Sequence, residues 1–212
     1  AALFTLVLGA PLAYLIARMR SNWAMVLLAG IVVSTFVTIV IKVFGLIIIF
    51  SADGLINKIL VGSGLLSDPF TILGSKSGIV VGLMHFTLGF GVLLLYGIFQ
   101  TVPRSLEEAA QILGASRARV HWRIVVPLSL PAITIGSIMI FNMCMGAFTS
   151  AALLGGARVL TLPVLIERTV ILQVKYSTGA TLAAILLVSV VLINLLSIYL
   201  LTQMRATSRV IT

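Results

Sequence analysis

Residues 105–131 read SLEEAAQILGASRARVHWRIVVPLSLP, a stretch that is unusually polar for the chain around it. It holds two of the five acidic residues and, with Arg104 just before it, four of the fourteen lysines and arginines. We therefore expect this segment to lie in water, whereas most of the chain does not.

Composition points to lipid as the solvent of the rest. Of the 212 residues, 60% are hydrophobic and only 9% are charged, whereas soluble domains carry about 25% charged residues. The net charge of +9 does not indicate nucleic-acid binding, because the basic residues lie in short loops and not on one continuous face. The one cysteine, Cys144, lies in an apolar run and excludes an intrachain disulfide.

The membrane spans follow from the gaps between charged residues. About 20 apolar residues cross a bilayer, and the charge-free gaps predict five spans, at about 1–17, 23–50, 78–101, 127–148 and 179–202. Each must be helical, because lipid offers no partner to backbone N–H and C=O groups. We therefore predict an all-α, polytopic membrane protein with one transmembrane domain over residues 1–212.

The distribution of basic residues sets the expected orientation, since cytoplasmic loops are enriched in them. The predicted cytoplasmic side holds Arg18, Arg20, Arg104, Arg117, Arg119, Arg123, Arg205 and Arg209, against Lys58, Lys76, Arg158, Arg168 and Lys175 outside. The chain starts in an apolar run with no basic leader, so we expect a further helix before residue 1.

Two segments on the predicted outer side are neither spans nor free loops. Residues 51–78 are rich in turn signals, with a short amphipathic helix expected over Ile56 to Val61. Residues 146–179 are too polar for a span and too apolar for an exposed loop. We expect them to form short packed helices.

The polar stretch itself predicts two short helices around a glycine. Ser105 and Glu108 fit a capping box at the start of the first helix. Gly114 is expected to end that helix in the left-handed conformation, and Ser116 to cap a second helix that runs to about Val126. An ordinary interfacial loop fits these local signals equally well.

The same stretch resembles a known family. Glu108-Ala109-Ala110, then Gly114, then an Ile124-x-x-Pro127-Leu128 exit resemble the cytoplasmic coupling loop in permease subunits of binding-protein-dependent ABC importers with the type I fold. GAPLAYLIARMRS (9–21), DGLIN (53–57) and GAFTSAALLGG (146–156) resemble other parts of these permeases. The family has six spans, so the resemblance also places a helix before residue 1.

The resemblance implies that the loop over residues 103–126 inserts a short helix into a groove of an ATPase subunit. The residues expected at that contact are Glu107, Glu108, Ala109, Ala110, Gly114 and Ala115, although a simply solvated Glu107 is an alternative. The implied partners are two ABC ATPase subunits, a second permease subunit (identical or paralogous), a periplasmic or tethered solute-binding protein and membrane lipid. ATP and Mg would be held by the ATPase, with no cofactor and no metal in this chain, which would sit in the bacterial inner membrane.

Candidate path residues lie in the fourth predicted span. Asn142, Phe141 and Phe148 are expected to line the solute path, with hydrogen bonding to a neighbouring helix as the alternative for Asn142. His85 and Lys42 are ionisable groups inside predicted spans and are functional candidates for that reason. A neutral, hydrogen-bonded His85 is the alternative.

Other function classes fit less well. The chain has no glycine-rich phosphate-binding loop and no His-Glu-x-x-His motif, so an enzyme is not expected. An ion-coupled secondary transporter is the runner-up, but it would need acids at mid-membrane, and no acid lies in a predicted span. Among permeases, DGLIN and GAFTSAALLGG resemble the spermidine/putrescine (polyamine and opine) branch, with sulfate, iron and thiamine permeases as alternatives.

Overall fold

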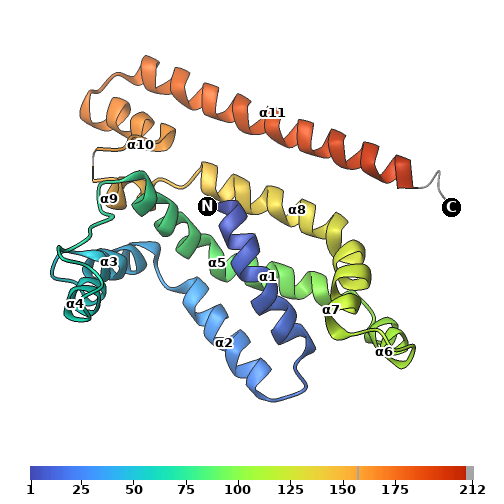
Figure 1. Ribbon diagram of the computed structural model, residues 1–212. Helices are drawn as coiled ribbons and strands as arrows, with labels where there is room; N and C mark the ends of the chain where they lie inside the picture. The colour runs from blue at the N-terminus through green and yellow to red at the C-terminus, as the bar shows by residue number, and fades with distance from the viewer. Residues whose placement is uncertain (157, 209–212) are drawn as a thin grey trace. The chain divides into compact units, whose positions relative to one another are not determined.

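The computed structural model describes residues 1–156 and 158–208, with side chains as far as Tyr199, and these residues form helices and turns without strands (Figure 1). The predicted all-α class is confirmed. The predicted cytoplasmic residue Arg209, and the side chain of Arg205, lie outside this description. The principal helices are α1 (Ala2–Arg18), α2 (Trp23–Phe36), α3 (Ile39–Phe50), α4 (Leu55–Gly62), α5 (Lys76–Gln100), α6 (Arg104–Ile112), α7 (Arg117–Val120), α8 (Val126–Met145), α9 (Thr149–Leu154), α10 (Leu162–Glu167) and α11 (Tyr176–Ser208).

The chain divides into two compact units. Unit 1 contains Phe36–Thr87 and Met143–Val190, together with Ala1. Unit 2 contains Ala2–Thr35, Leu88–Asn142 and the chain from Val191 onward. Helices α5, α8 and α11 each contribute residues to both units. The 103–126 loop belongs wholly to unit 2.

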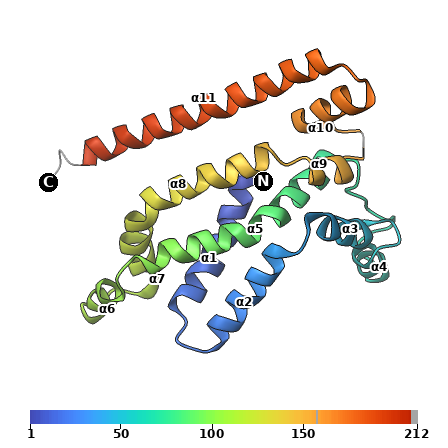
Figure 2. The same ribbon diagram turned by 180° about the vertical axis from the view of Figure 1, so that it is seen from behind.

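The core of unit 2 forms where α1 packs against the second half of α5 (Figure 2). Gly9, Ala13 and Ala17 recur every four residues on α1 and are all buried, which creates a strip of small side chains that permits close helix approach. A Cβ on Gly9 would lie 3.4 Å from Val92 of α5. Around this strip the buried core contains Ala13, Ile16, Ala17, Val92, Leu95, Phe99 and Val125. The C-terminal end of α1 is therefore held firmly beside α5.

Unit 1 packs α9 and α10 against the start of α5. Ile79, Ala151 and Val164 form its small buried cluster. Gly82 lies so close to Leu154 of α9 that a Cβ there would clash, and Gly74 donates its N–H to the Leu154 carbonyl at 2.8 Å. The expected short helices after residue 146 are α9 and α10, followed by a π-helical turn over Arg168–Leu172.

Helix α4 confirms the short amphipathic helix expected over Ile56 to Val61. It is held by Asn57, whose side chain is 1% exposed. The Asn57 amide nitrogen donates to the carbonyls of Ser51 and Phe70, both at 2.7 Å, and its oxygen accepts from the Phe70 N–H at 2.8 Å. One buried amide thus closes the loop around α4.

Within the described residues, four helical segments have the length and apolar character needed to cross a bilayer: Ile39–Gly62, Lys76–Gln100, Arg117–Met145 and Tyr176–Tyr199. Ala2–Arg18 and Trp23–Phe36 are shorter apolar helices. The segment predicted as one helix over 23–50 is in fact two, because α2 ends at Phe36 and Thr38 takes the N-cap position of α3 with a non-helical ψ of 132°. The break lies in a β-branched run, where Thr35 donates its hydroxyl to the Ile31 carbonyl at 2.7 Å, a bond that bends helices.

A helix boundary expected at Pro127 is also absent. Helix α7 passes through a π-helical turn, η1 (His121–Val125), directly into α8. Pro127 lacks an N–H and cannot continue the regular ladder of hydrogen bonds. The helix widens just before it, with the Val126 N–H bonded to the His121 carbonyl, and so continues without ending.

Candidate functional site: the 103–126 loop

Helix α6 opens the loop, and its start differs from the prediction. Pro103 is the N-cap, in an extended conformation, and no side chain caps the helix. The capping box expected at Ser105 and Glu108 is therefore wrong. The Glu108 carboxylate instead accepts a hydrogen bond from Arg20 at 3.0 Å, a partner that lies 88 positions away.

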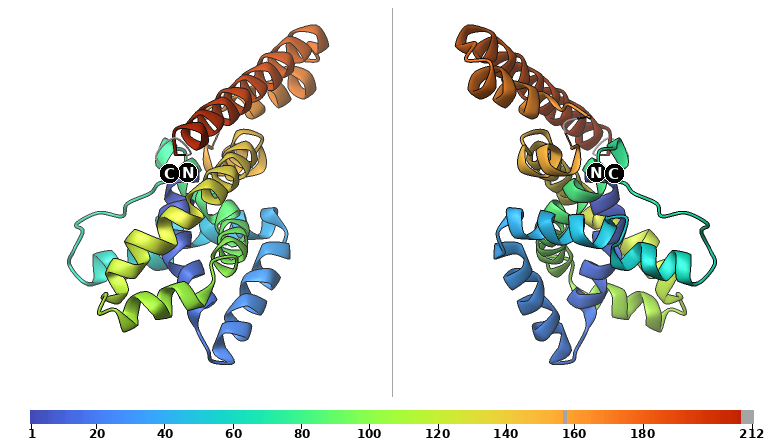
Figure 3. Two further views of the ribbon diagram at one scale, coloured as in Figure 1. Left: turned by 90° about the vertical axis from the view of Figure 1, so that its right-hand side faces the viewer. Right: turned by 90° about the vertical axis from the view of Figure 1, so that its left-hand side faces the viewer.

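The turn after α6 confirms the role predicted for Gly114. Its φ is +83°, in the left-handed region that glycine adopts without strain. The Gly114 N–H bonds to the Gln111 carbonyl at 2.9 Å and the Ala115 N–H to the Ala110 carbonyl at 3.0 Å, the paired bonds of a Schellman motif. Ser116 then caps α7 by accepting from the Arg119 N–H. Figure 3 shows α6 leaving the end of α5 and α7 turning back toward α8.

Glu107 points into the protein, against α1. It is 6% exposed, forms an ion pair with Arg18 and accepts a hydrogen bond from the Tyr14 hydroxyl at 3.0 Å. The alternative of a solvated Glu107 is therefore wrong, and direct contact of Glu107 with a partner surface is not supported by this position. The paired Arg18 also donates to the Val102 carbonyl at 3.2 Å, just ahead of α6.

Two further arginines connect α1 with the loop. Arg104, the first residue of α6, donates to the Ala17 carbonyl at 2.7 Å, so it satisfies one of the carbonyls that the end of α1 leaves free. Arg20 pairs with Glu108 at 3.0 Å, with side chains 79% and 58% exposed. A cavity of about 520 Å³ opens beside these contacts, lined by four arginines and two glutamates.

Tyr14 is fixed by aromatic neighbours as well as by Glu107. Its ring packs edge-on against Phe99 of α5 with centroids 5.6 Å apart, and against His121 of η1 at 4.3 Å. The hydroxyl that meets Glu107 is therefore held in place from two sides. The contacts of Tyr14, Arg18 and Arg104 with the loop were not predicted from the sequence, because the partners lie 84 to 93 positions away along the chain.

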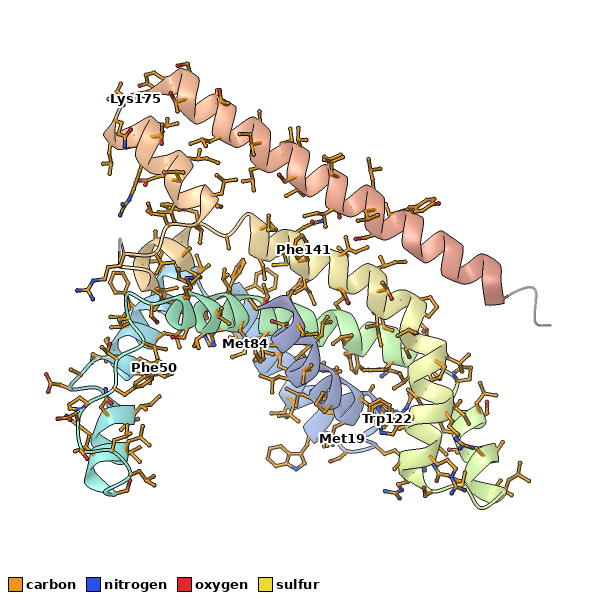
Figure 4. All side chains as sticks on the ribbon, turned by 45° about the horizontal axis from the view of Figure 1, so that its top comes forward. Met19, Phe50, Met84, Trp122, Phe141 and Lys175 are labelled. Atoms are coloured by element: carbon orange, nitrogen blue, oxygen red, sulfur yellow. The ribbon has the colours of Figure 1, made fainter. Side chains whose placement is uncertain are left out.

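Apolar side chains at the end of α6 and in η1 are exposed to the surroundings. Ile112 is 85% exposed and Leu113 is 88% exposed, at the tip next to Gly114. Trp122 of η1 is 69% exposed (Figure 4). Of the predicted docking residues, Glu108, Ala109 and Gly114 are exposed, whereas Ala110 and Ala115 are half-buried. Large exposed apolar residues at a loop tip are typical of a surface that a partner covers.

The three predicted path residues do not all belong to one unit: Phe141 and Asn142 are in unit 2 and Phe148 is in unit 1. Asn142 of α8 and Asn194 of α11 form a reciprocal pair of amide hydrogen bonds at 3.0 and 3.1 Å, which is the neighbouring-helix alternative. Phe141 is half-buried in unit 2, and Phe148 belongs to unit 1 and is 37% exposed. Lys42 and His85, both in unit 1, are half-buried.

Known proteins resemble the chain over most of its length. The spermidine/putrescine permease PotB of Haemophilus influenzae is 31% identical over 76% of this chain and 56% of its own length, and PotB of Escherichia coli is 34% identical over 74% and 58%. The molybdenum permease ModB of Mycobacterium tuberculosis is 29% identical over 71% of the chain and 55% of its own length. The chain thus spans a little over half the length of these relatives.

A solved structure confirms the fold. The permease fold matches a chain in the crystal structure of a bacterial alginate ABC transporter in complex with its alginate pentasaccharide-bound periplasmic protein, with a TM-score of 0.79 at 20% identity over 92% of this chain and 71% of that one. The model of the family described as "Binding-protein-dependent transport system inner membrane component" matches residues 8–206. By that match the chain belongs to the family of inner-membrane components of binding-protein-dependent transport systems.

Proposed function

We propose that the chain is the membrane-spanning permease subunit of an ATP-driven importer and that its 103–126 loop docks an ATPase subunit. One observation carries this proposal: the loop is fastened to α1 on one side while Ile112 and Leu113 at its tip are 85% and 88% exposed. A rigid apolar tip beside the exposed Glu108 carboxylate, which Arg20 pairs at the surface, suits insertion into a groove of a partner.

The proposed assembly contains more than this chain. Two ATPase subunits bind the loops of two permease subunits, which are identical or paralogous, and hold the ATP and Mg. A periplasmic or tethered binding protein delivers the solute, and the alginate transporter, which was crystallised with a pentasaccharide-bound periplasmic protein, supports that role by analogy. The 103–126 loop then faces the cytoplasm, and residues 51–77 and 149–178 face outside.

The proposed solute is a polyamine or a related amino compound. Its support is the similarity to PotB of two organisms, at 31% and 34% identity. The similarity to ModB, at 29% identity, favours an inorganic oxyanion as the second candidate. With few acids available to hold a polycation, solute selection rests mainly with the binding protein.

A docking experiment tests the loop. Leu113→Asp should abolish co-purification of the ATPase subunit with the permease, because a charge at the tip cannot enter an apolar groove. Ser105→Asp is the matched control: it adds the same charge to the first turn of α6, where an acid is tolerated, and co-purification should persist. Equal co-purification with both variants would contradict docking through this tip.

An uptake experiment tests the solute. Uptake of radiolabelled putrescine should fall in a strain lacking the gene and return when the intact gene is supplied. Uptake of molybdate or sulfate serves as the control. Loss of anion uptake with unchanged putrescine uptake would overturn the polyamine assignment and leave the permease proposal standing.

A further inference from the structure

We propose that Tyr14, Arg18 and Glu107 form a clasp that passes displacement of the 103–126 loop to α1, so that they position the loop for coupling and do not themselves touch the ATPase. The inference rests on the proposed function, in which the loop docks an ATPase. It assigns a role to side chains that are largely buried between α1 and α6.

The first support is the number of independent contacts that meet at one place. Arg18 pairs with Glu107 in α6 and donates to the Val102 carbonyl in the linker before it. Arg104 returns a bond from α6 to the Ala17 carbonyl at 2.7 Å. The last turn of α1 and the first turn of α6 are thereby tied in both directions. A push on α6 has to move the end of α1 as well.

Burial is the second support. The Arg18 and Glu107 side chains are 15% and 8% exposed, so water cannot readily replace either partner, and separation would leave a buried charge uncompensated. The neighbouring Arg20–Glu108 pair is 79% and 58% exposed and can exchange its partner for water at little cost. The buried pair therefore resists stretching, whereas the exposed pair does not.

The third support is the path of the chain. Between α5 and α6 lie only Thr101, Val102 and Pro103, and α6 ends at the Gly114 turn with its apolar tip exposed. Tyr14, which meets Glu107, is itself packed against Phe99 of α5 and His121 of η1. The clasp thus joins α6 to the buried core of unit 2 and not only to its own linker.

The test uses the complete complex of permease, ATPase and binding protein, reconstituted in liposomes. The measured quantity is the fold-stimulation of ATP hydrolysis by the binding protein as purified, which needs no knowledge of the solute. Glu107→Gln and Arg18→Gln should retain the ATPase and its basal hydrolysis but lose stimulation by about five-fold or more. Arg117→Gln, which removes the same charge from the same cavity, is the control and should leave stimulation unchanged.

Two further variants complete the test. Exchanging the charges, Arg18→Glu with Glu107→Arg, should restore part of the stimulation that each single change removes. Tyr14→Phe keeps the ring and removes only the hydroxyl that donates to Glu107. It tests the clasp if the complex with Glu107→Gln does not assemble. We expect Tyr14→Phe to lose less stimulation than Glu107→Gln.

The outcomes are distinct. If basal and stimulated hydrolysis fall together, so that fold-stimulation is unchanged, the clasp only supports docking and the proposal is overturned. Unchanged stimulation in Tyr14→Phe, when Glu107→Gln does not assemble, overturns it too. If the wild-type chain binds no ATPase, the proposed function fails and the clasp proposal falls with it.

Discussion

The 103–126 loop of unit 2 and the 51–75 segment of unit 1 each carry a short helix between longer apolar helices, yet different side chains hold them. Helix α4 is held by the amide of Asn57, bonded to Ser51 and Phe70, which lie 6 and 13 positions away. Helix α6 is held by Glu107, Val102 and Arg104, bonded to residues of α1 that lie 84 to 93 positions away.

The difference bears on what each segment can transmit. Helix α4 keeps its shape through residues close to it in the sequence, and the 51–75 segment bonds to a distant residue at its far end, where Gly74 donates to the Leu154 carbonyl of α9. A loop tied by charged side chains to a distant helix moves with that helix, and the helix with it. The local bonds around α4 suit a surface that keeps a fixed conformation. The long-range bonds of α6 suit a loop that transmits a displacement to α1.

The largest expected effect breaks the long-range arrangement. Glu107→Ala leaves Arg18 buried without its partner and should lower the free energy of unfolding by about 3–5 kcal/mol. Denaturation of the purified chain in mixed micelles measures it. A loss below about 1 kcal/mol, the range of an exposed ion pair, would mean that water reaches Arg18 and that the Arg18–Glu107 pair contributes little to stability.

The next effect breaks the local arrangement. Asn57→Ala removes the three hydrogen bonds that the buried Asn57 amide makes to the backbone of Ser51 and Phe70 and should cost about 2–3 kcal/mol. Limited proteolysis should show new cleavage within residues 51–75, while co-purification of the ATPase is unchanged. Loss of the ATPase in this variant would contradict the idea that α4 is held by its own neighbours and does not act on the 103–126 loop.

A smaller effect sharpens the comparison at the loop tip. Gly114→Val places a β-branched residue at a φ of +83°, which should cost about 1–3 kcal/mol through backbone strain alone, because a Cβ there would meet open space. ATPase co-purification should weaken. Gly114→Asn is the control, since asparagine adopts this conformation more readily; equal weakening by both would point to a contact of the glycine itself.

The smallest effect concerns the exposed pair. Arg20→Gln removes the partner of Glu108, with side chains 79% and 58% exposed, and should change the unfolding free energy by no more than about 1 kcal/mol. The same micelle measurement as for Glu107→Ala tests it. A cost as large as that of Glu107→Ala would remove the distinction between the two ion pairs.

Local chemistry made part of this structure predictable. Gly114 follows a run of helix formers and Ser116 opens the next helix, so their roles were confirmed. The α6 cap was mispredicted because the capping-box pattern competes with a partner, Arg20, that only the folded chain brings near. Turns and caps made by residues close together in the sequence can therefore be predicted, whereas pairs of residues far apart in the sequence cannot.

Longer-range features had no readable signal. Glu107 and Glu108 are neighbours of the same type, and only the position of α1 buries one and exposes the other. The break between α2 and α3 was hidden because both helices are apolar, and apolarity alone was used to predict the span. For Asn142, hydrogen bonding to a neighbouring helix was an expected alternative, but the sequence did not pair it with Asn194, 52 positions away.

The π-helical turn at His121–Val125 joins α7, η1 and α8 into one continuous helix. A residue added to a regular α-helix rotates everything beyond it by about 100°, but the wider π-helical turn takes up one extra residue within itself. Deletion of a single residue from this turn should therefore restore regular α-helix and leave α7 facing almost the same way relative to α8. The turn acts as a spacer just ahead of Pro127, and the loop keeps its direction in spite of the extra residue.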